Sequence, residues 1–95
     1  MRYFYVYILS NPTRTEFIVG VTDNLLKIVS GDSQTSVNSL KDLVYFEVYE
    51  DMQQALKREK QLISTSRIKK LLLIMKSNPY IESLNLEISN FPDRK

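Results

Sequence analysis

Tyr3-Phe4-Tyr5-Val6-Tyr7-Ile8-Leu9 is the stretch that decides the fold of this chain, because all seven side chains are aromatic or branched aliphatic. With no polar residue on either alternating face, such a run is typical of a central strand buried on both faces. The turn residues 11–14 follow it, and residues 15–19 predict a second strand. Because the connection is short, the two strands are expected to form an antiparallel hairpin.

Downstream of the hairpin, the sequence predicts a third strand and several helices. Residues 43–49 alternate loosely and predict the strand. Asp23 or Asn24 is a suitable N-cap for a short helix over residues 25–29, and the polar residues 30–38 after it predict a loop.

Two longer helices and a last turn are expected in the second half of the chain. Asp51 precedes a helix whose expected apolar stripe is Met52, Ala55, Leu56, Leu62 and Ile63. One of Ser64, Thr65 and Ser66 is expected to cap the next helix, which carries Ile68, Leu71, Leu72 and Met75 on one face. Asn78-Pro79 predicts the start of a short final turn that ends near Leu86.

Length and composition exclude several classes of protein. Ninety-five residues make one domain, expected over residues 1–88 with a frayed tail at 89–95. The absence of Cys and His excludes disulfides, thiolate nucleophiles, imidazole bases and Cys- or His-based metal sites. No segment approaches the roughly 20 apolar residues that span a bilayer, and no secretory signal is recognisable. The expected location is therefore the cytoplasm, without a membrane partner.

The net charge of +2 is unevenly distributed. Residues 57–76 hold seven bases and one acid, a local balance of +6, whereas the remainder has a balance of −4. A cationic segment of this kind attracts phosphate backbones through counterion release. The alternative interpretation is an ordinary solvated helix surface.

Glu59 is the residue that does not fit a simple core pattern. It lies three residues after Leu56, four after Ala55 and four before Ile63, so helical spacing places it on the apolar stripe. A carboxylate in that position must be paired, neutralised or bound to a cation. It could bind Mg²⁺ together with water and a substrate phosphate, or simply reach solvent or pair with Arg58 or Lys60.

Six segments in order and spacing resemble the GIY-YIG nuclease domain, in its small stand-alone bacterial branch. The resemblance covers roughly residues 3 to 84, nearly the whole chain. The matching segments are residues 5–11 (YVYILSN), 17–22 (FIVGVT) with 24–25 (NL), 43–45 (LVY), 55–62 (ALKREKQL), 66–70 (SRIKK) and 78–79 (NP).

This resemblance implies an α+β fold with a three-stranded antiparallel sheet flanked by helices. It further implies phosphodiester cleavage with one divalent cation, Mg²⁺ or Mn²⁺. Position by position, Tyr7 corresponds to the first motif tyrosine, Glu59 to the metal-binding carboxylate and Asn78 to the late asparagine. These three residues are the candidate catalytic set.

Other positions of the family pattern lack their functional groups. The second motif tyrosine is Ile18, or Phe17 if a bulge shifts the register, and neither side chain carries a hydroxyl. The first-helix arginine and histidine positions are Ile28 and Asp32, and a tryptophan position is Thr65. Losing one charge-stabilising group typically costs about 10²- to 10³-fold in rate, so the pattern indicates a degenerate, inactive or impaired nuclease.

Three functions follow as hypotheses. The first is a nucleic-acid-binding remnant that contacts DNA, including branched DNA, or RNA through Lys57, Arg58, Lys60, Arg67, Lys69 and Lys70. The second is a protein-interaction module on the inactive scaffold, for which the apolar run at residues 71–75 would supply a docking face. The third is an active metal-dependent endonuclease that uses Tyr7, Glu59 and Asn78. Binding in gel shifts and cleavage abolished by Glu59→Ala distinguish these hypotheses.

Overall fold

The central strand β1 (Phe4–Ser10) organises the fold, as the apolar run predicts. The computed structural model describes residues 2–29 and 40–89 of the chain. Within them, β1 pairs antiparallel with β2 (Phe17–Thr22) on one edge and with β3 (Asp42–Tyr49) on the other. The helices are α1 (Leu25–Val29), α2 (Met52–Ile63), α3 (Arg67–Ser77) and α4 (Asn85–Ser89).

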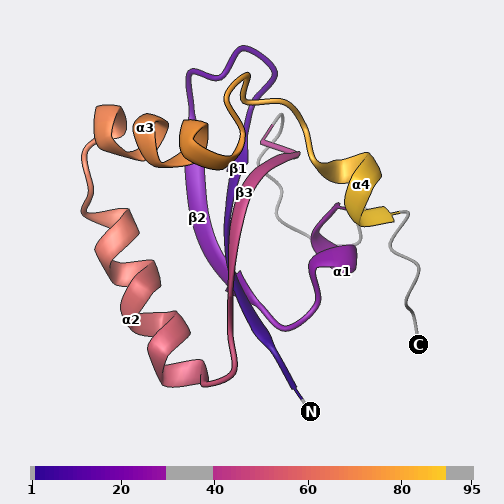
Figure 1. Ribbon diagram of the computed structural model, residues 1–95, viewed down its shortest axis with the longest axis vertical. Helices are drawn as coiled ribbons and strands as arrows, with labels where there is room; N and C mark the ends of the chain where they lie inside the picture. The colour runs from indigo at the N-terminus through magenta and orange to yellow at the C-terminus, as the bar shows by residue number, and fades with distance from the viewer. Residues whose placement is uncertain (1, 30–39, 90–95) are drawn as a thin grey trace.

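Helices cover both faces of the sheet (Figure 1). On the face that we call the α2–α3 face, the fully buried Val6 and Ile8 of β1 pack against side chains of α2 and α3. On the opposite face, the α1–α4 face, Tyr5, Tyr7 and Leu9 pack against α1 and α4. Successive side chains of a strand point to opposite faces, so β1 contributes to the core on both sides.

The second strand lies further along the chain than predicted. The sequence pattern predicts it at residues 15–19, but β2 begins at Phe17 and continues through Gly20 to Thr22. The reason is a side chain, because Asn11 Oδ1 accepts hydrogen bonds from the backbone N–H groups of Thr15 (2.9 Å) and Glu16 (3.1 Å). These backbone donors are therefore satisfied within the turn, and the strand starts after them.

The expected turn at Asn78-Pro79 is present, closed by the Ile81 N–H, which donates to the Asn78 carbonyl at 2.9 Å, but it does not continue as a helical turn to Leu86. Asn78 ends α3 rather than starting a helix, since its backbone N–H donates to the carbonyl of Ile74 at 2.8 Å. The last helix begins later, at Asn85, and includes Ser89, which was assigned to the tail. The remaining tail residues 90–95 and the expected loop at 30–38 lie outside the residues that the structure describes.

The predicted apolar stripe of α2 was correct only in part. Ala55 and Leu62 are buried against the sheet, whereas three other predicted members are exposed, namely Met52, Leu56 and Ile63. The helix is rotated so that the half-buried Arg58 and Glu59 share the sheet-facing side with Ala55 and Leu62. With this rotation, Arg58 reaches a strand residue in the ion pair described below. In the described part of the chain, no helix is both long and apolar enough to cross a membrane.

Candidate functional site

The ring of Tyr7 lies across Gly20 on the neighbouring strand β2. The two residues are cross-strand partners in the β1–β2 ladder. A Cβ atom added at Gly20 would lie 2.5 Å from Cζ of Tyr7, far inside van der Waals contact. Glycine at this position therefore makes room for the tyrosine ring, and any side chain would displace the hydroxyl.

Glu59 lies within electrostatic reach of the Tyr7 hydroxyl. Burial raises the pKa of Tyr7, and the negative charge of Glu59 raises it further. The helix that carries Glu59 packs against both β2 and β1. Within residues 2–29 and 40–89, the Glu59 carboxylate forms no ion pair and receives no hydrogen bond, so the expected alternative of pairing with Arg58 or Lys60 does not occur there.

Apolar side chains stand at the positions that the resemblance aligned with further polar groups, Ile18 and Ile28. The β1–β2 register is continuous from Tyr5 to Ser10, so no bulge brings Phe17 to the face of Tyr7. Phe17 packs instead on the α2–α3 face. Ile18, 39% exposed, is therefore the residue beside Gly20 on the tyrosine face. Ile28 of α1 packs into the cluster that includes Tyr7.

Asn78 does not join Tyr7 and Glu59, because its side chain is fully engaged elsewhere. Its Nδ2 donates to the carbonyls of Val44 (3.0 Å) and Glu82 (2.9 Å), and its Oδ1 accepts from the Glu82 backbone N–H (3.0 Å). Val44 belongs to β3 and lies on the α2–α3 face, whereas the Tyr7 ring leans toward β2 on the opposite face. The structure thus gives Asn78 a structural role, tying the end of α3 to β3.

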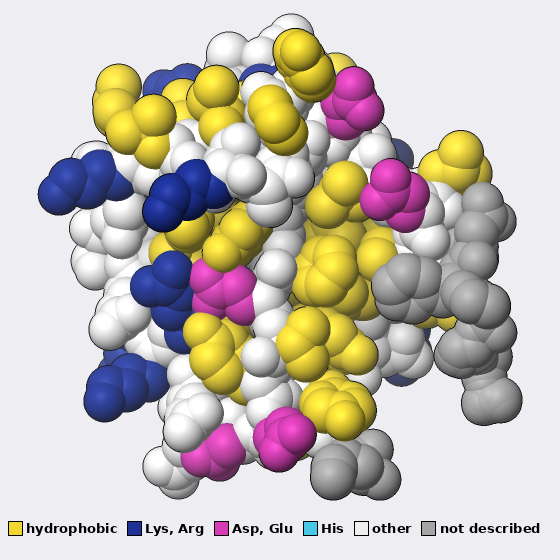
Figure 2. Space-filling model, viewed as in Figure 1, with side chains coloured by type: hydrophobic (Ala, Val, Ile, Leu, Met, Phe, Trp, Pro, Cys, Tyr) yellow, Lys and Arg dark blue, Asp and Glu magenta, His cyan; other side chains and the backbone are white. Residues whose placement is uncertain are grey.

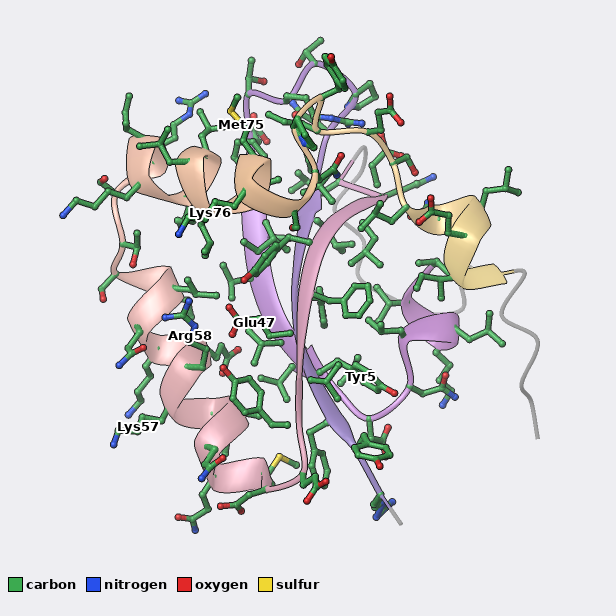
Figure 3. The ribbon with its side chains drawn as sticks, in the orientation of Figure 1. Tyr5, Glu47, Lys57, Arg58, Met75 and Lys76 are labelled. Atoms are coloured by element: carbon green, nitrogen blue, oxygen red, sulfur yellow. The ribbon has the colours of Figure 1, made fainter. Side chains whose placement is uncertain are left out.

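Arg58 is held by a half-buried network on the α2–α3 face. Its Nε and Nη2 donate to the two carboxylate oxygens of Glu47 at 2.9 and 3.0 Å, and Figure 3 shows the two side chains pointing toward one another. The hydroxyls of Tyr45 and Tyr49 donate to the same carboxylate. Burial alone would raise the pKa of Glu47, but hydrogen bonds from Arg58, Tyr45 and Tyr49 bring this pKa below its usual value.

The assignment of Arg58 to phosphate binding therefore needs correction, since its guanidinium is already neutralised. Glu47 is not among the site residues predicted from the sequence. A signal was present, however, because Tyr45, Glu47 and Tyr49 recur at a period of two and must share one face of a strand.

The other predicted phosphate contacts have no acidic partner in the described part of the chain. Salt bridges join Arg2 to Asp23, Arg14 to Asp42 and Arg58 to Glu47, so none involves the remaining cations of α2 and α3. These cations are Lys57, Lys60, Arg67, Lys69, Lys70 and Lys76. Figure 2 shows that Lys and Arg side chains gather over α2 and α3, and Figure 3 shows Lys57 pointing away from the sheet.

Two of these cations also line a surface cavity of about 160 Å³. Its lining residues are Thr15, Phe17, Arg67 and Lys70. Arg67 and Lys70 are predicted phosphate contacts, whereas Thr15 and Phe17 are not. No local pattern could have identified those two, because at least fifty positions separate the two halves of the cavity. Arg67 donates to the Thr15 carbonyl across a separation of 52 residues.

Comparisons with known proteins establish the fold. No protein-family model matches the chain, and neither does any curated protein. The chain is similar to the solution NMR structure of the UPF0213 protein BH0048 from Bacillus halodurans, with a TM-score of 0.57 and 23% sequence identity. The match covers 97% of this chain and 99% of that chain. It confirms the expected α+β fold, in which helices flank a three-stranded antiparallel sheet.

Proposed function

We propose that this protein is a nucleic-acid-binding domain built on a GIY-YIG nuclease-like scaffold whose hydrolytic centre is impaired. The order and spacing of the six matching segments support the scaffold. The retained Tyr7 and Glu59, together with the apolar residues at Ile18 and Ile28, support the impairment.

The observation that carries the binding function is the set of uncompensated cations on α2 and α3. Arg58 is neutralised by Glu47, but the other basic side chains of these helices have no carboxylate partner in the described part of the chain. Unpaired surface cations bind the phosphate backbone and release its condensed counterions. Because such contacts read charge rather than base sequence, we expect low sequence specificity.

The proposed loss of hydrolytic activity follows from the missing hydroxyl and guanidinium groups. Hydrolysis of a phosphodiester needs charge stabilisation and an oriented nucleophile. At Ile18 and Ile28 no hydroxyl or guanidinium is available, and each such group is typically worth about 10²- to 10³-fold in rate. Tyr7 and Glu59 retain a hydroxyl and a carboxylate within electrostatic reach of one another, while the position that the resemblance assigns to the arginine is Ile28.

The Tyr7–Glu59 pair offers a divalent cation only one carboxylate ligand. Glu59 offers one half-buried carboxylate that has no partner among residues 2–29 and 40–89, and no group of three or more acidic side chains gathers there. One carboxylate plus waters and a phosphate is an ordinary environment for Mg²⁺. A bound cation would neutralise phosphate oxygens. We therefore propose that Glu59 holds Mg²⁺ or Mn²⁺ jointly with bound nucleic acid.

The binding proposal predicts a defined salt dependence. The double variant Lys57→Gln/Lys69→Gln should reduce the slope of log K against log salt by about 1.8 in magnitude, since each phosphate contact contributes about 0.9. Fluorescence anisotropy with duplex, forked DNA and hairpin RNA measures this slope. The matched control is Arg2→Gln/Lys41→Gln, which removes two charges outside the cationic helices. Equal slopes for both doubles, or no binding at low salt, would overturn the proposal.

If Glu59 holds a cation, bound Mn²⁺ should broaden the NMR signals of nearby residues by paramagnetic relaxation, without any cleavage of the nucleic acid. With an oligonucleotide bound, Mn²⁺ should broaden the amide signals of Gly20 and Tyr7, and Glu59→Gln should remove this broadening because the carboxylate is gone. Glu50→Gln serves as the control, since Glu50 is an exposed acid that precedes α2. Uniform broadening would contradict the role of Glu59. Multiple-turnover cleavage that Glu59→Gln abolishes would instead establish an active endonuclease.

A protein-interaction module is the second candidate function, favoured by one surface. Ile68 and Leu72 on α3 are 66% and 60% exposed, and Met75 continues the same stripe at helical spacing. An apolar stripe of this kind is typical of docking faces. The two candidates differ in ionic-strength dependence, because apolar docking persists at high salt whereas phosphate contacts weaken.

A further inference from the structure

The surface cavity beside β2 lies apart from the Tyr7–Glu59 pair and has a chemistry of its own. Arg67 and Lys70 are three residues apart, so both project from one face of the first turn of α3. Thr15 and Phe17 face them from the end of the β1–β2 turn and the start of β2. The cavity lining thus contains two cations, a hydroxyl and an aromatic ring, but no carboxylate.

The cavity is held in a fixed shape by the turn on its far side. Two hydrogen bonds join Thr15 to the Asn11 side chain. Asn11 Oδ1 accepts from the Thr15 backbone N–H at 2.9 Å, and Asn11 Nδ2 donates to Thr15 Oγ1 at 2.8 Å. Arg67 Nη2 in turn donates to the Thr15 carbonyl. One N–H group therefore anchors the guanidinium. Its other N–H groups have no acceptor among the described residues, and neither does the ammonium of Lys70.

The charge of the cavity matches a phosphate monoester better than an internal phosphodiester. A terminal phosphate carries about −1.5 to −2 charges at pH 7, whereas a phosphodiester carries one. Two cations without a carboxylate partner among the described residues complement a dianion, and both lie in the first turn of α3, where the helix dipole adds a partial positive charge. A volume of about 160 Å³ accommodates a phosphate group while leaving the Phe17 ring accessible beside it.

We propose that this cavity binds the terminal phosphate of a nucleic-acid strand. Arg67 and Lys70 bind the phosphate oxygens, and the ring of Phe17 contacts the terminal sugar or base. The nucleic-acid source of the phosphate rests on the proposed function, whereas the affinity for a phosphate monoester rests on the cavity alone.

The test compares oligonucleotides of one sequence that carry a 5′-phosphate, a 3′-phosphate or hydroxyls at both ends. One terminal phosphate should raise the affinity at least about tenfold, because it gains hydrogen bonds to two charged groups. Lys70→Gln should abolish this gain. Lys69 lies on the same helix but outside the cavity. Lys69→Gln should therefore lower the affinity for all three oligonucleotides by the same factor and leave the gain from a terminal phosphate intact. Equal affinities of wild-type protein for the three ligands would overturn the inference.

A second measurement separates a binding defect from a folding defect. Arg67→Gln removes the hydrogen bond to Thr15 as well as the charge, so it could affect folding. Lys70→Gln breaks no hydrogen bond among the described residues and is therefore the main variant for the binding test. Inorganic phosphate followed by NMR should shift the amide signals of Thr15, Phe17, Arg67 and Lys70 in the wild-type protein. Shifts spread evenly over the basic helices would overturn a defined cavity site.

Failure of the inference and failure of the proposed function give different results. Salt-dependent oligonucleotide binding with no gain from a terminal phosphate overturns the inference alone. Inorganic phosphate shifts at the cavity without binding of any oligonucleotide overturn the proposed function and, with it, the nucleic-acid source of the phosphate.

Discussion

Replacing Asn78 with Asp should lower the free energy of unfolding by about 3–4 kcal/mol, because it turns a satisfied buried amide into a carboxylate facing two carbonyl oxygens. In the native structure Nδ2 donates to the carbonyls of Val44 and Glu82, and the side chain is almost fully buried. An ionised Asp donates to neither carbonyl. Only the bond from the Glu82 backbone N–H to the side-chain oxygen can persist.

Urea denaturation at pH 7, followed by circular dichroism, measures this loss. Gln54→Glu makes the same amide-to-acid change at an exposed position of α2 and should stay within about 0.5 kcal/mol of wild type. If Asn78→Asp also stays within this range, the structural role assigned to Asn78 is wrong, and a role in chemistry becomes open again.

Replacing Glu47 with Ala should lower the free energy of unfolding by about 2–3 kcal/mol, since it leaves a half-buried guanidinium and two tyrosine hydroxyls without their acceptor. The Glu47 and Arg58 side chains are 17% and 30% exposed, so solvent screens the pair only in part. Glu50→Ala, at an exposed acid just beyond β3, should change stability little. A loss no larger than that of Glu50→Ala would contradict the network.

The same network predicts how stability depends on pH. The pKa of Glu47 is lower in the folded protein than in the unfolded chain, where it is about 4.3. The folded state therefore binds fewer protons, and the stabilisation is fully present above the unfolded pKa and is lost as pH falls through the folded pKa. Denaturation of wild type and Glu47→Gln between pH 7 and pH 3 should show a steeper acid-side loss in wild type. Parallel profiles would refute this assignment.

Local sequence signals accounted for the framework of the fold. The apolar run of β1 required a strand buried on both faces, and the structure confirms it, with Val6 and Ile8 buried on one face and Leu9 on the other. Helix caps were also readable, since Asp51 accepts from the backbone N–H of Gln53 and Ser66 from that of Lys69. A buried strand and a helix cap each depend on residues only a few positions apart, so the local sequence pattern is enough to predict them.

Helix rotation and side-chain pairing were beyond the reach of local patterns. Periodicity assigned Leu56 and Ile63 to the buried stripe of α2, but both are exposed. Instead, α2 turns Arg58 toward Glu47 on β3, and that pairing joins two different elements. The choice between Ile18 and Phe17 likewise depended on the strand register, which only the β1–β2 ladder defines.

The sequence alone thus determined the order of the three strands and of the two longer helices and the cationic character of residues 57–76, and it suggested that Tyr7 and Glu59 resemble residues of a nuclease pattern. Only the tertiary structure decided which groups are available: it neutralised Arg58, engaged Asn78 and placed Arg67 and Lys70 opposite Thr15 and Phe17. The physical reason is that the availability of a polar group depends on the atoms within about 3 Å of it. In a folded chain most of those atoms come from residues far away in sequence.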